Sequence, residues 1–421
     1  MYGMQEIFDK CLHENLKLNV IGPKVLERKL EKIGIKITGF QREDFKVQFS
    51  DPDFKVLNFD FSEEQIYGAG FSSESDLALK VTEIVKDLTE SIIEVVDNFI
   101  NEGIDDFIQN IVSDISKSVK NNLYKNIDEM FNNRSQISSD YISEINNIWG
   151  DALQLLQACI AIYDEATLSF VKTHIKEKEY NVTLDVLLKL NARASQTTKE
   201  ILSLLQNGFA DGALARWRSL HEISVISLFI KEHGDKVALM YLEHEGIHSY
   251  KAAIQFNEYR TRLGYAPVDD KEVGELFVNY NDLLEKYGKN YKYPYGWATE
   301  AINLSKPNFY DIECSIELDH LRPFYKFASN NVHANSKGML FRLGLYPDDD
   351  ALLAGASYIG LSEPAKLTVI SFNQILTSLL MNIESIDTII ICQIMMDFCG
   401  DVEKEFSLIE AKLAKKFNKE E

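Results

Sequence analysis

The sequence predicts a mainly α protein: a multi-helix bundle with a small α+β element at its N-terminus. From about residue 75 onward, apolar residues recur every three or four positions, whereas before residue 62 they alternate with polar ones. The 421 residues are 45% hydrophobic and include only 8 Pro, which suffices for a sizeable core and excludes a disordered chain. We therefore expect a small α+β element (1–70), a helical region without an assigned role (71–180) and a helical bundle domain (181–421).

The N-terminal element is expected to combine one helix with a three-strand antiparallel meander. Pro23 suits the first turn of a helix over 23–32. Apolar residues alternate in 33–37 and 45–49, and a third apolar run, 54–61, follows a Pro-containing turn. The edge of such a meander can pair with a strand of another protein. A non-enzymatic protein-interaction module is therefore one hypothesis for function.

A helical period of 3.6 residues covers most of the remaining chain. In 77–100, residues such as Leu77, Val81, Ile84 and Leu88 fall on one face of a helix. Similar patterns predict helices over 104–131, 139–176, 182–206, 210–232, 235–263, 269–287, 315–333 and 363–416. Breaks between them fall at Gly and Pro, for example at Asn207-Gly208 and His233-Gly234.

Charge, cysteine content and hydropathy point to a soluble cytoplasmic protein without a membrane span, and we also expect a homo-oligomer. With 44 basic and 65 acidic residues the net charge is −21, so any site for an anion must be local. The five cysteines form no CxxC pair, which is typical of free thiols in a reducing compartment. The most apolar stretch, 388–396, is too short to cross a bilayer, which takes about 20 residues, and the N-terminus lacks the pattern of a signal peptide.

Two segments without acidic residues interrupt this acidic chain. Residues 321–346 contain no Asp or Glu, and residues 286–299 combine three lysines with four tyrosines and a tryptophan. Cations next to aromatic rings can neutralise phosphates and stack on bases. The pattern predicts a local site for RNA or a nucleotide, and the candidate anion-binding residues are Arg322, Lys326, Lys337, Arg342, Lys292 and Trp297. Alternatively, the tyrosines pack on the bundle and the lysines are solvated.

Candidate catalytic residues lie in two helical patterns. Arg218 and Glu222 are four residues apart, so they share a helix face and can pair. Tyr325, Ser329 and His333 repeat the same spacing. A histidine beside hydroxyls and cations can take a proton from a ribose 2′-hydroxyl while the cations stabilise the developing charge. The pattern indicates a metal-independent ribonuclease without a cofactor; the open alternatives are a histidine hydrogen-bonded in the core and a helix-stabilising ion pair.

A formal HExxH motif gives a third hypothesis, a zinc-dependent hydrolase. His244 and His248 are spaced to share one zinc ion, with Glu245 between them as general base. Gly246 weakens a helix at this position, and no third ligand is placed convincingly by the sequence. We therefore expect no metal, with zinc as the alternative.

Two strings together resemble a bacterial family. ALARWRSLHEISVISLFI (213–230) resembles the Arg-Ser-Leu-x-Glu helix of the proteins grouped as domain of unknown function five-six-seven-seven. The stretches YGWATEAIN and HLRPFYKFASNNVHANSKG resemble that family's Trp and its Tyr-x-x-x-Ser-x-x-x-His segment. The resemblance covers about 183–400 and implies a helical protein whose family positions are Arg218, Glu222, Trp297, Tyr325, Ser329 and His333.

The chain also resembles, more distantly, the HEPN ribonucleases of bacterial toxin and antiviral systems. Their motif is an Arg, four to six residues, then a His, and they cut RNA without a metal. Arg216 and His221 have this spacing, but Trp217 stands where that family prefers a polar residue. This resemblance implies a toxin-type or antiviral-defence effector that acts on RNA.

Overall fold

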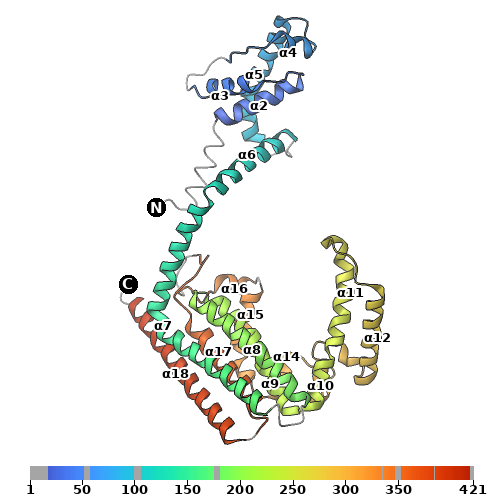
Figure 1. Ribbon diagram of the computed structural model, residues 1–421, viewed down its shortest axis with the longest axis vertical. Helices are drawn as coiled ribbons and strands as arrows, with labels where there is room; N and C mark the ends of the chain where they lie inside the picture. The colour runs from blue at the N-terminus through green and yellow to red at the C-terminus, as the bar shows by residue number, and fades with distance from the viewer. Residues whose placement is uncertain are drawn as a thin grey trace. The chain divides into compact units, whose positions relative to one another are not determined.

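The computed structural model describes residues 18–51, 57–98, 106–174, 181–333, 335–346, 352–383 and 385–417. The chain divides into two compact units, unit 1 (residues 1–139) and unit 2 (residues 140–421). Throughout the described ranges the regular structure consists of helices, and none of it is β-strand. The expected mainly α fold with many helices is therefore confirmed (Figure 1).

Unit 1 is helical, and the predicted meander is wrong. Residues 45–48 of the second expected strand lie inside a helix, residues 33–38 form a turn and an extended link, and residues 57–61 are irregular. Residues 54–56 of the third expected strand fall outside the described ranges. The helix expected over 23–32 lies within α2. The helices of this unit are α2 (Leu18–Lys32), α3 (Gly39–Gln48), α4 (Glu63–Gly68), α5 (Glu74–Asn98) and α6 (Asp106–Lys125).

A capping box explains why the segment after Thr38 is helical. The Gln41 N–H donates to Thr38 Oγ1 at 3.2 Å, and the Thr38 N–H donates to the Gln41 side chain at 2.8 Å. In the helix that follows, Phe45 and the adjoining Phe49 share a face and are buried, while Val47 between them is 70% exposed. The same residues fit a period of two, so the sequence pattern alone did not distinguish strand from helix.

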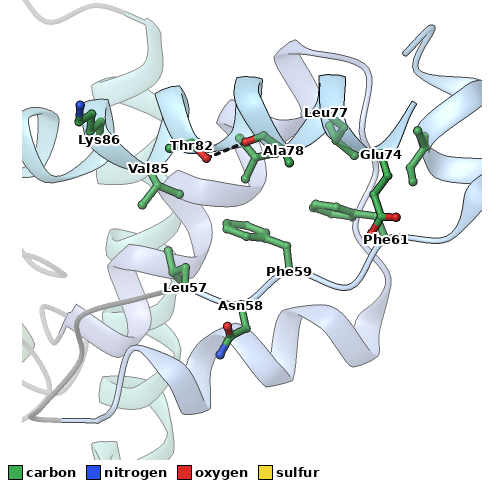
Figure 2. A pocket seen from close by; sticks show the side chains of 12 residues that line it. Leu57, Asn58, Phe59, Phe61, Glu74, Leu77, Ala78, Thr82, Val85 and Lys86 are labelled. Atoms are coloured by element: carbon green, nitrogen blue, oxygen red, sulfur yellow. Dashed lines mark hydrogen bonds between the residues drawn. The ribbon is translucent and has the colours of Figure 1, made fainter. Parts of the chain in front are cut away.

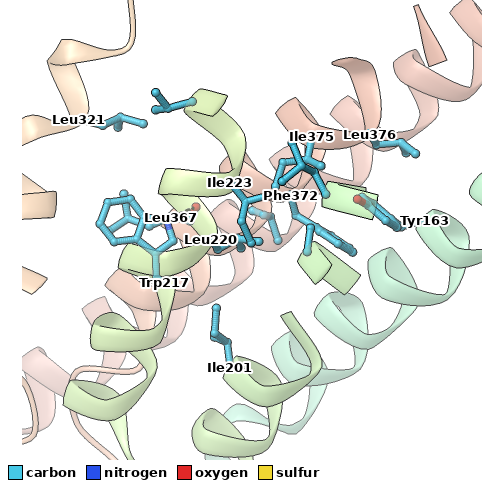
Figure 3. Packing of buried hydrophobic residues seen from close by; sticks show 14 of the residues in the cluster. Tyr163, Ile201, Trp217, Leu220, Ile223, Leu321, Leu367, Phe372, Ile375 and Leu376 are labelled. Carbon is cyan, nitrogen blue, oxygen red and sulfur yellow. Dashed lines mark hydrogen bonds between the residues drawn. The ribbon is translucent and has the colours of Figure 1, made fainter. Parts of the chain in front are cut away.

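Unit 2 is built around α9, which is apolar on most sides. The long helices of this unit are α7 (Ile127–His174), of which it contains residues 140–174, α8 (Val182–Gln206), α9 (Ala210–His233), α17 (Ser362–Leu380) and α18 (Ile386–Phe417). The α9 helix packs on both α8 and α17, and α17 packs on α18 (Figure 1). Trp217 and Leu220 of α9 and Phe372 of α17 are completely buried in this core (Figure 3).

Shorter helices complete unit 2 and carry most of the candidate residues. They are α10 (Asp235–Glu243), α11 (Glu245–Leu263), α12 (Asp270–Tyr287), η1 (Lys289–Lys292), η2 (Gly296–Ala298), α13 (Thr299–Ile302), α14 (Phe309–Ser315), η3 (Asp319–Leu321), α15 (Arg322–Val332) and α16 (Ser336–Leu340). The helix expected over 235–263 is divided at His244. Both α14 and α15 pack on α9. In the described residues, no helix is long and apolar enough to cross a membrane.

Candidate functional site

Four of the five predicted catalytic residues lie together between α9 and α15. Arg218 donates from Nε to Ser329 Oγ at 3.1 Å and from Nη2 to the Tyr325 hydroxyl at 2.5 Å. The same Nη2 lies 2.9 Å from Glu222 Oε1, which also accepts a hydrogen bond of 2.6 Å from the Tyr325 hydroxyl. We call these four residues the Arg218 cluster. Each helix supplies two of them one turn apart, because both pairs have a four-residue spacing.

The Arg218 cluster lies at the edge of the core, and its tyrosine is protonated. Tyr325 is 7% exposed, whereas the side chains of Arg218 and Glu222 are 25% and 30% exposed. Burial, together with the hydrogen bond to the Glu222 carboxylate, raises the pKa of Tyr325 well above its ordinary value. At neutral pH this phenol is therefore a hydrogen-bond donor and not a base.

A second polar cluster lies beside the first, and the sequence did not reveal it. His221 Nε2 is 2.9 Å from Glu313 Oε1, and both side chains are completely buried. Arg322 Nη1 donates to the other Glu313 oxygen at 2.5 Å. The guanidinium carbons of Arg322 and Arg218 lie 5.0 and 4.6 Å from the centroid of the Tyr325 ring. Tyr325 therefore links the two clusters.

One sequence signal does point to the buried acid. Glu313 follows the buried Phe309 by four residues and adjoins the buried Ile312 on α14. Helical spacing therefore places its carboxylate on an apolar face, where it needs a partner. The positions of the apolar residues in α14 thus indicate that Glu313 is a buried acid.

His333 does not join the Arg218 cluster. It is the exposed residue at the C-terminal end of α15, and its backbone N–H donates to the Ser329 carbonyl at 3.0 Å. The Ser329 hydroxyl donates to the Tyr325 carbonyl at 2.8 Å and accepts from Arg218, so Ser329 is already engaged. The imidazole of His333 makes no hydrogen bond with the described residues and faces solvent.

Three of the predicted anion-binding residues line two separate hollows. Arg322 and Lys326 line an open hollow of about 700 Å³, which we call the Arg322 hollow; its other lining residues are Asn308, Tyr310, Asp319 and Pro323. Arg342 lines a different hollow, of about 470 Å³, beside the first turn of α9. Lys337, which lies between Lys326 and Arg342 in the sequence, is exposed on α16 and lines neither hollow. The acid-free segment 321–346 therefore does not form one continuous patch.

Trp297 is a core residue, and its predicted role in anion binding is wrong. It is 3% exposed, and its ring packs edge-on against Phe229 and Tyr241 with centroids 5.7 and 5.0 Å apart. A ring enclosed in this way cannot stack on a base. Tyr291 is also buried, and its hydroxyl donates to the Met240 carbonyl. Lys292 remains partly exposed, with its Nζ 5.6 Å from the Tyr293 ring.

The comparisons with known proteins concern this same part of unit 2. Residues 184–351 match the model of a family of unknown function, DUF5677. The match includes the Arg218 cluster, Glu313 and the Arg322 hollow, and it stops before α17 and α18. The chain has no significant match among curated proteins or among solved structures.

Within the matched residues 184–351, the two residues with HEPN spacing point to different partners. Arg216 donates to Glu200 of α8, whereas His221 contacts Glu313 of α14. Five residues along a helix turn the side chain by about 140° beyond one full turn, so the two side chains diverge. No guanidinium–imidazole pair of the HEPN kind is formed by Arg216 and His221.

The first histidine of the HExxH motif, His244, joins the start of α11 to the segment around η1 by hydrogen bonds. His244 is 2% exposed, and its Nε2 donates to the carbonyls of Tyr291 and Tyr293 at 2.9 and 3.0 Å. Its Nδ1 lies 3.1 Å from His248 Nε2 and therefore accepts that N–H. Both ring nitrogens of His244 are thus engaged, and none of the described residues form a group of three or more His, Cys, Asp and Glu that could hold a metal ion. The geometry gives the zinc hypothesis no support.

We expect His244 to make unit 2 less stable in mild acid. Burial lowers the pKa of His244 below its ordinary value of 6.5. As the pH falls below about 6.5, the unfolded chain binds a proton at this residue before the folded chain does, so stability present above that pH is lost. Between pH 7.5 and 5.5, the urea midpoint should fall more in the wild type than in His244→Gln, which keeps an N–H donor. An equal fall in both proteins would contradict this assignment.

Proposed function

We propose that unit 2 binds a phosphate-bearing ligand, RNA or a nucleotide, at the Arg322 hollow and acts on it by metal-independent acid–base chemistry. The observation that carries this proposal is that Arg322 and Lys326, two cations from an acid-free segment, line one open hollow together with the ring of Tyr310. In a chain of net charge −21, such a pair is a local exception to the surrounding field. A role as a defence or toxin-type effector is part of this proposal and rests on the HEPN resemblance.

The groups lining the Arg322 hollow suit the parts of a nucleotide. Glu313 accepts a hydrogen bond from Nη1 of Arg322, whose side chain is 25% exposed. The other N–H groups of this guanidinium are therefore available to a phosphate. Lys326 is exposed and forms no ion pair with the described residues. The Arg322 guanidinium carbon lies over the Tyr310 ring, 5.2 Å from its centroid, and Tyr310 is 44% exposed, so a base that stacks on this ring also lies close to the Arg322 cation. Asp319 can accept a hydrogen bond from a ribose hydroxyl.

His333 is the proposed general base, because its imidazole is exposed and not engaged by other described side chains. It lies seven residues after Lys326, which is about 10 Å along the chain at helical rise. In RNA cleavage, His333 takes the proton of a 2′-hydroxyl, and the 2′-oxygen attacks the adjacent phosphorus. The bond from phosphorus to the 5′-oxygen then breaks, and the departing oxygen takes a proton from water. Arg218 and Arg322 stabilise the charge that develops on the phosphoryl oxygens.

Cleavage of labelled single-stranded RNA in excess EDTA tests this function. Wild type should cleave, and His333→Ala should lower the rate about 100-fold or more. Lys326→Glu should weaken RNA binding about tenfold, or about 1.4 kcal/mol. Lys404→Glu, the same charge reversal on an exposed part of α18, should leave binding unchanged. All three variants should keep the wild-type melting temperature, since these side chains are exposed.

The outcomes separate the two parts of the proposal. If wild type neither binds nor cleaves RNA, and also does not bind nucleotides, the proposed function is wrong. Binding without cleavage would overturn the chemistry but leave the phosphate site. Cleavage that persists in His333→Ala would remove His333 as the base.

A further inference from the structure

Unit 1 contains an apolar cavity that the proposed function does not use. It is open on one side and has a volume of about 500 Å³ between α5 and residues 57–61 (Figure 2). This volume is within the range of about 300–1,000 Å³ found for small-molecule sites. The cavity therefore has the size of a ligand site.

The two walls of the cavity are apolar and differ in kind. On α5, Leu77, Val81 and Val85 follow one another at four-residue steps over about 12 Å. Leu77 and Val81 belong to the core of unit 1 and are only 2% and 4% exposed, whereas Val85 is partly exposed. Opposite them, the rings of Phe59 and Phe61 stack with centroids 5.6 Å apart and point toward α5 (Figure 2). An elongated, apolar molecule at this place would contact mainly Val85, Phe59 and Phe61, the partly exposed apolar side chains of the cavity.

The polar side chains at the cavity indicate where a charged group of that molecule lies. The Thr82 hydroxyl donates to the Ala78 carbonyl at 2.7 Å, so this donor is used within α5 (Figure 2). Glu74 lies in the first turn of α5, where the helix itself stabilises a carboxylate. Lys86, three turns further along α5, lines the other end of the cavity and makes no ion pair with the described residues. Lys86 is therefore the charge available to a ligand.

We propose that this cavity binds a linear amphiphile with an anionic head, of the class of medium-chain carboxylates. The alkyl chain lies between Val85 and the rings of Phe59 and Phe61, and the carboxylate lies at Lys86. Removing the alkyl chain from water supplies the affinity, and the ammonium group of Lys86 selects the sign of the head group. This inference is independent of the function proposed for unit 2.

Titration of the full-length chain with decanoate, followed by calorimetry, tests the cavity. Ala78→Phe places a ring in the cavity without removing a buried side chain, and should weaken decanoate binding at least about tenfold. Leu79→Phe enlarges the neighbouring residue, which is 73% exposed and does not line the cavity, and should bind like wild type. Melting curves of both variants show whether each is folded. Equal binding by the two folded variants, or no binding by wild type, would overturn the proposal.

The head group is tested with decyltrimethylammonium, which has the same alkyl chain and the opposite charge. Wild type should prefer decanoate, and Lys86→Glu should reverse this preference. Lys36→Glu, a charge reversal elsewhere in unit 1, should leave the preference as in wild type. If wild type binds both amphiphiles equally, or if Lys86→Glu changes nothing, Lys86 does not select the head group and the proposed ligand class is wrong.

Discussion

Replacing Glu313 by alanine is expected to lower the free energy of unfolding of unit 2 by about 3 kcal/mol. The Glu313 carboxylate is completely buried and contacts both His221 and Arg322. Its removal leaves a buried imidazole and a partly buried guanidinium without their acceptor. Glu313→Gln keeps the shape but removes the charge, so its loss should be smaller.

Urea unfolding followed by tryptophan fluorescence measures this loss specifically in unit 2. All three tryptophans, Trp149, Trp217 and Trp297, belong to that unit. Glu410→Ala is the matched control, because it removes the same side chain from an exposed position on α18. Its effect should stay within about 0.5 kcal/mol. Should Glu313→Ala unfold at the same urea concentration as Glu410→Ala, the buried carboxylate does not stabilise unit 2.

Trp217→Ala should have a still larger effect, a loss of about 3–5 kcal/mol. Trp217 is completely buried where α9 packs on α17 (Figure 3). Its indole N–H donates to the Leu367 carbonyl at 2.9 Å and to the Ser371 hydroxyl at 3.0 Å. Alanine leaves a cavity of nearly the whole indole and an unpaired serine hydroxyl. Trp217→Phe fills most of that volume and should lose less.

The control for Trp217→Ala removes an aromatic ring from the start of the same helix. Phe209 adjoins the first turn of α9 and is 43% exposed, so Phe209→Ala should cost less than about 1.5 kcal/mol. Both variants keep Trp149 and Trp297 as fluorescent reporters. A comparable loss in the two variants would contradict the packing of α9 against α17.

The position of Trp217 also explains why the HEPN resemblance does not extend to the site. The indole of Trp217 lies where α9 packs on α17. Arg216, directly before it, contacts Glu200 of α8, and His221, one turn after it, contacts Glu313 of α14. The neighbouring Arg218 turns to α15 instead. Consecutive residues of a helix that is buried on most sides contact different helices, so spacing along the sequence does not bring Arg216 and His221 together.

The sequence predicted α8 and α9 of unit 2 closely, because their boundaries are set by local chemistry. The helical pattern expected over 363–416, in contrast, is divided into α17 and α18, and the expected helix 139–176 begins earlier, within α7 (Ile127–His174). The expected helices 182–206 and 210–232 correspond to α8 (Val182–Gln206) and α9 (Ala210–His233), which end next to Asn207-Gly208 and Gly234. Both glycines have a positive φ, which other residues adopt only with strain. The expectation failed in unit 1, where Phe45, Val47 and Phe49 fit both periods and a capping box selected the helix.

The sequence by itself determined the mainly helical fold and the pairs of residues that share a helix face, Arg218 with Glu222 and Tyr325 with Ser329. These follow from the 3.6-residue period, which is a local property of the chain. Only the tertiary structure decided that the two pairs meet, that Glu313 pairs with His221 and Arg322, and that Trp297 is enclosed by the core. Such contacts join residues up to about a hundred positions apart, and they depend on how α9, α14 and α15 pack. A helical period fixes which face a side chain occupies, but not which other helix covers that face.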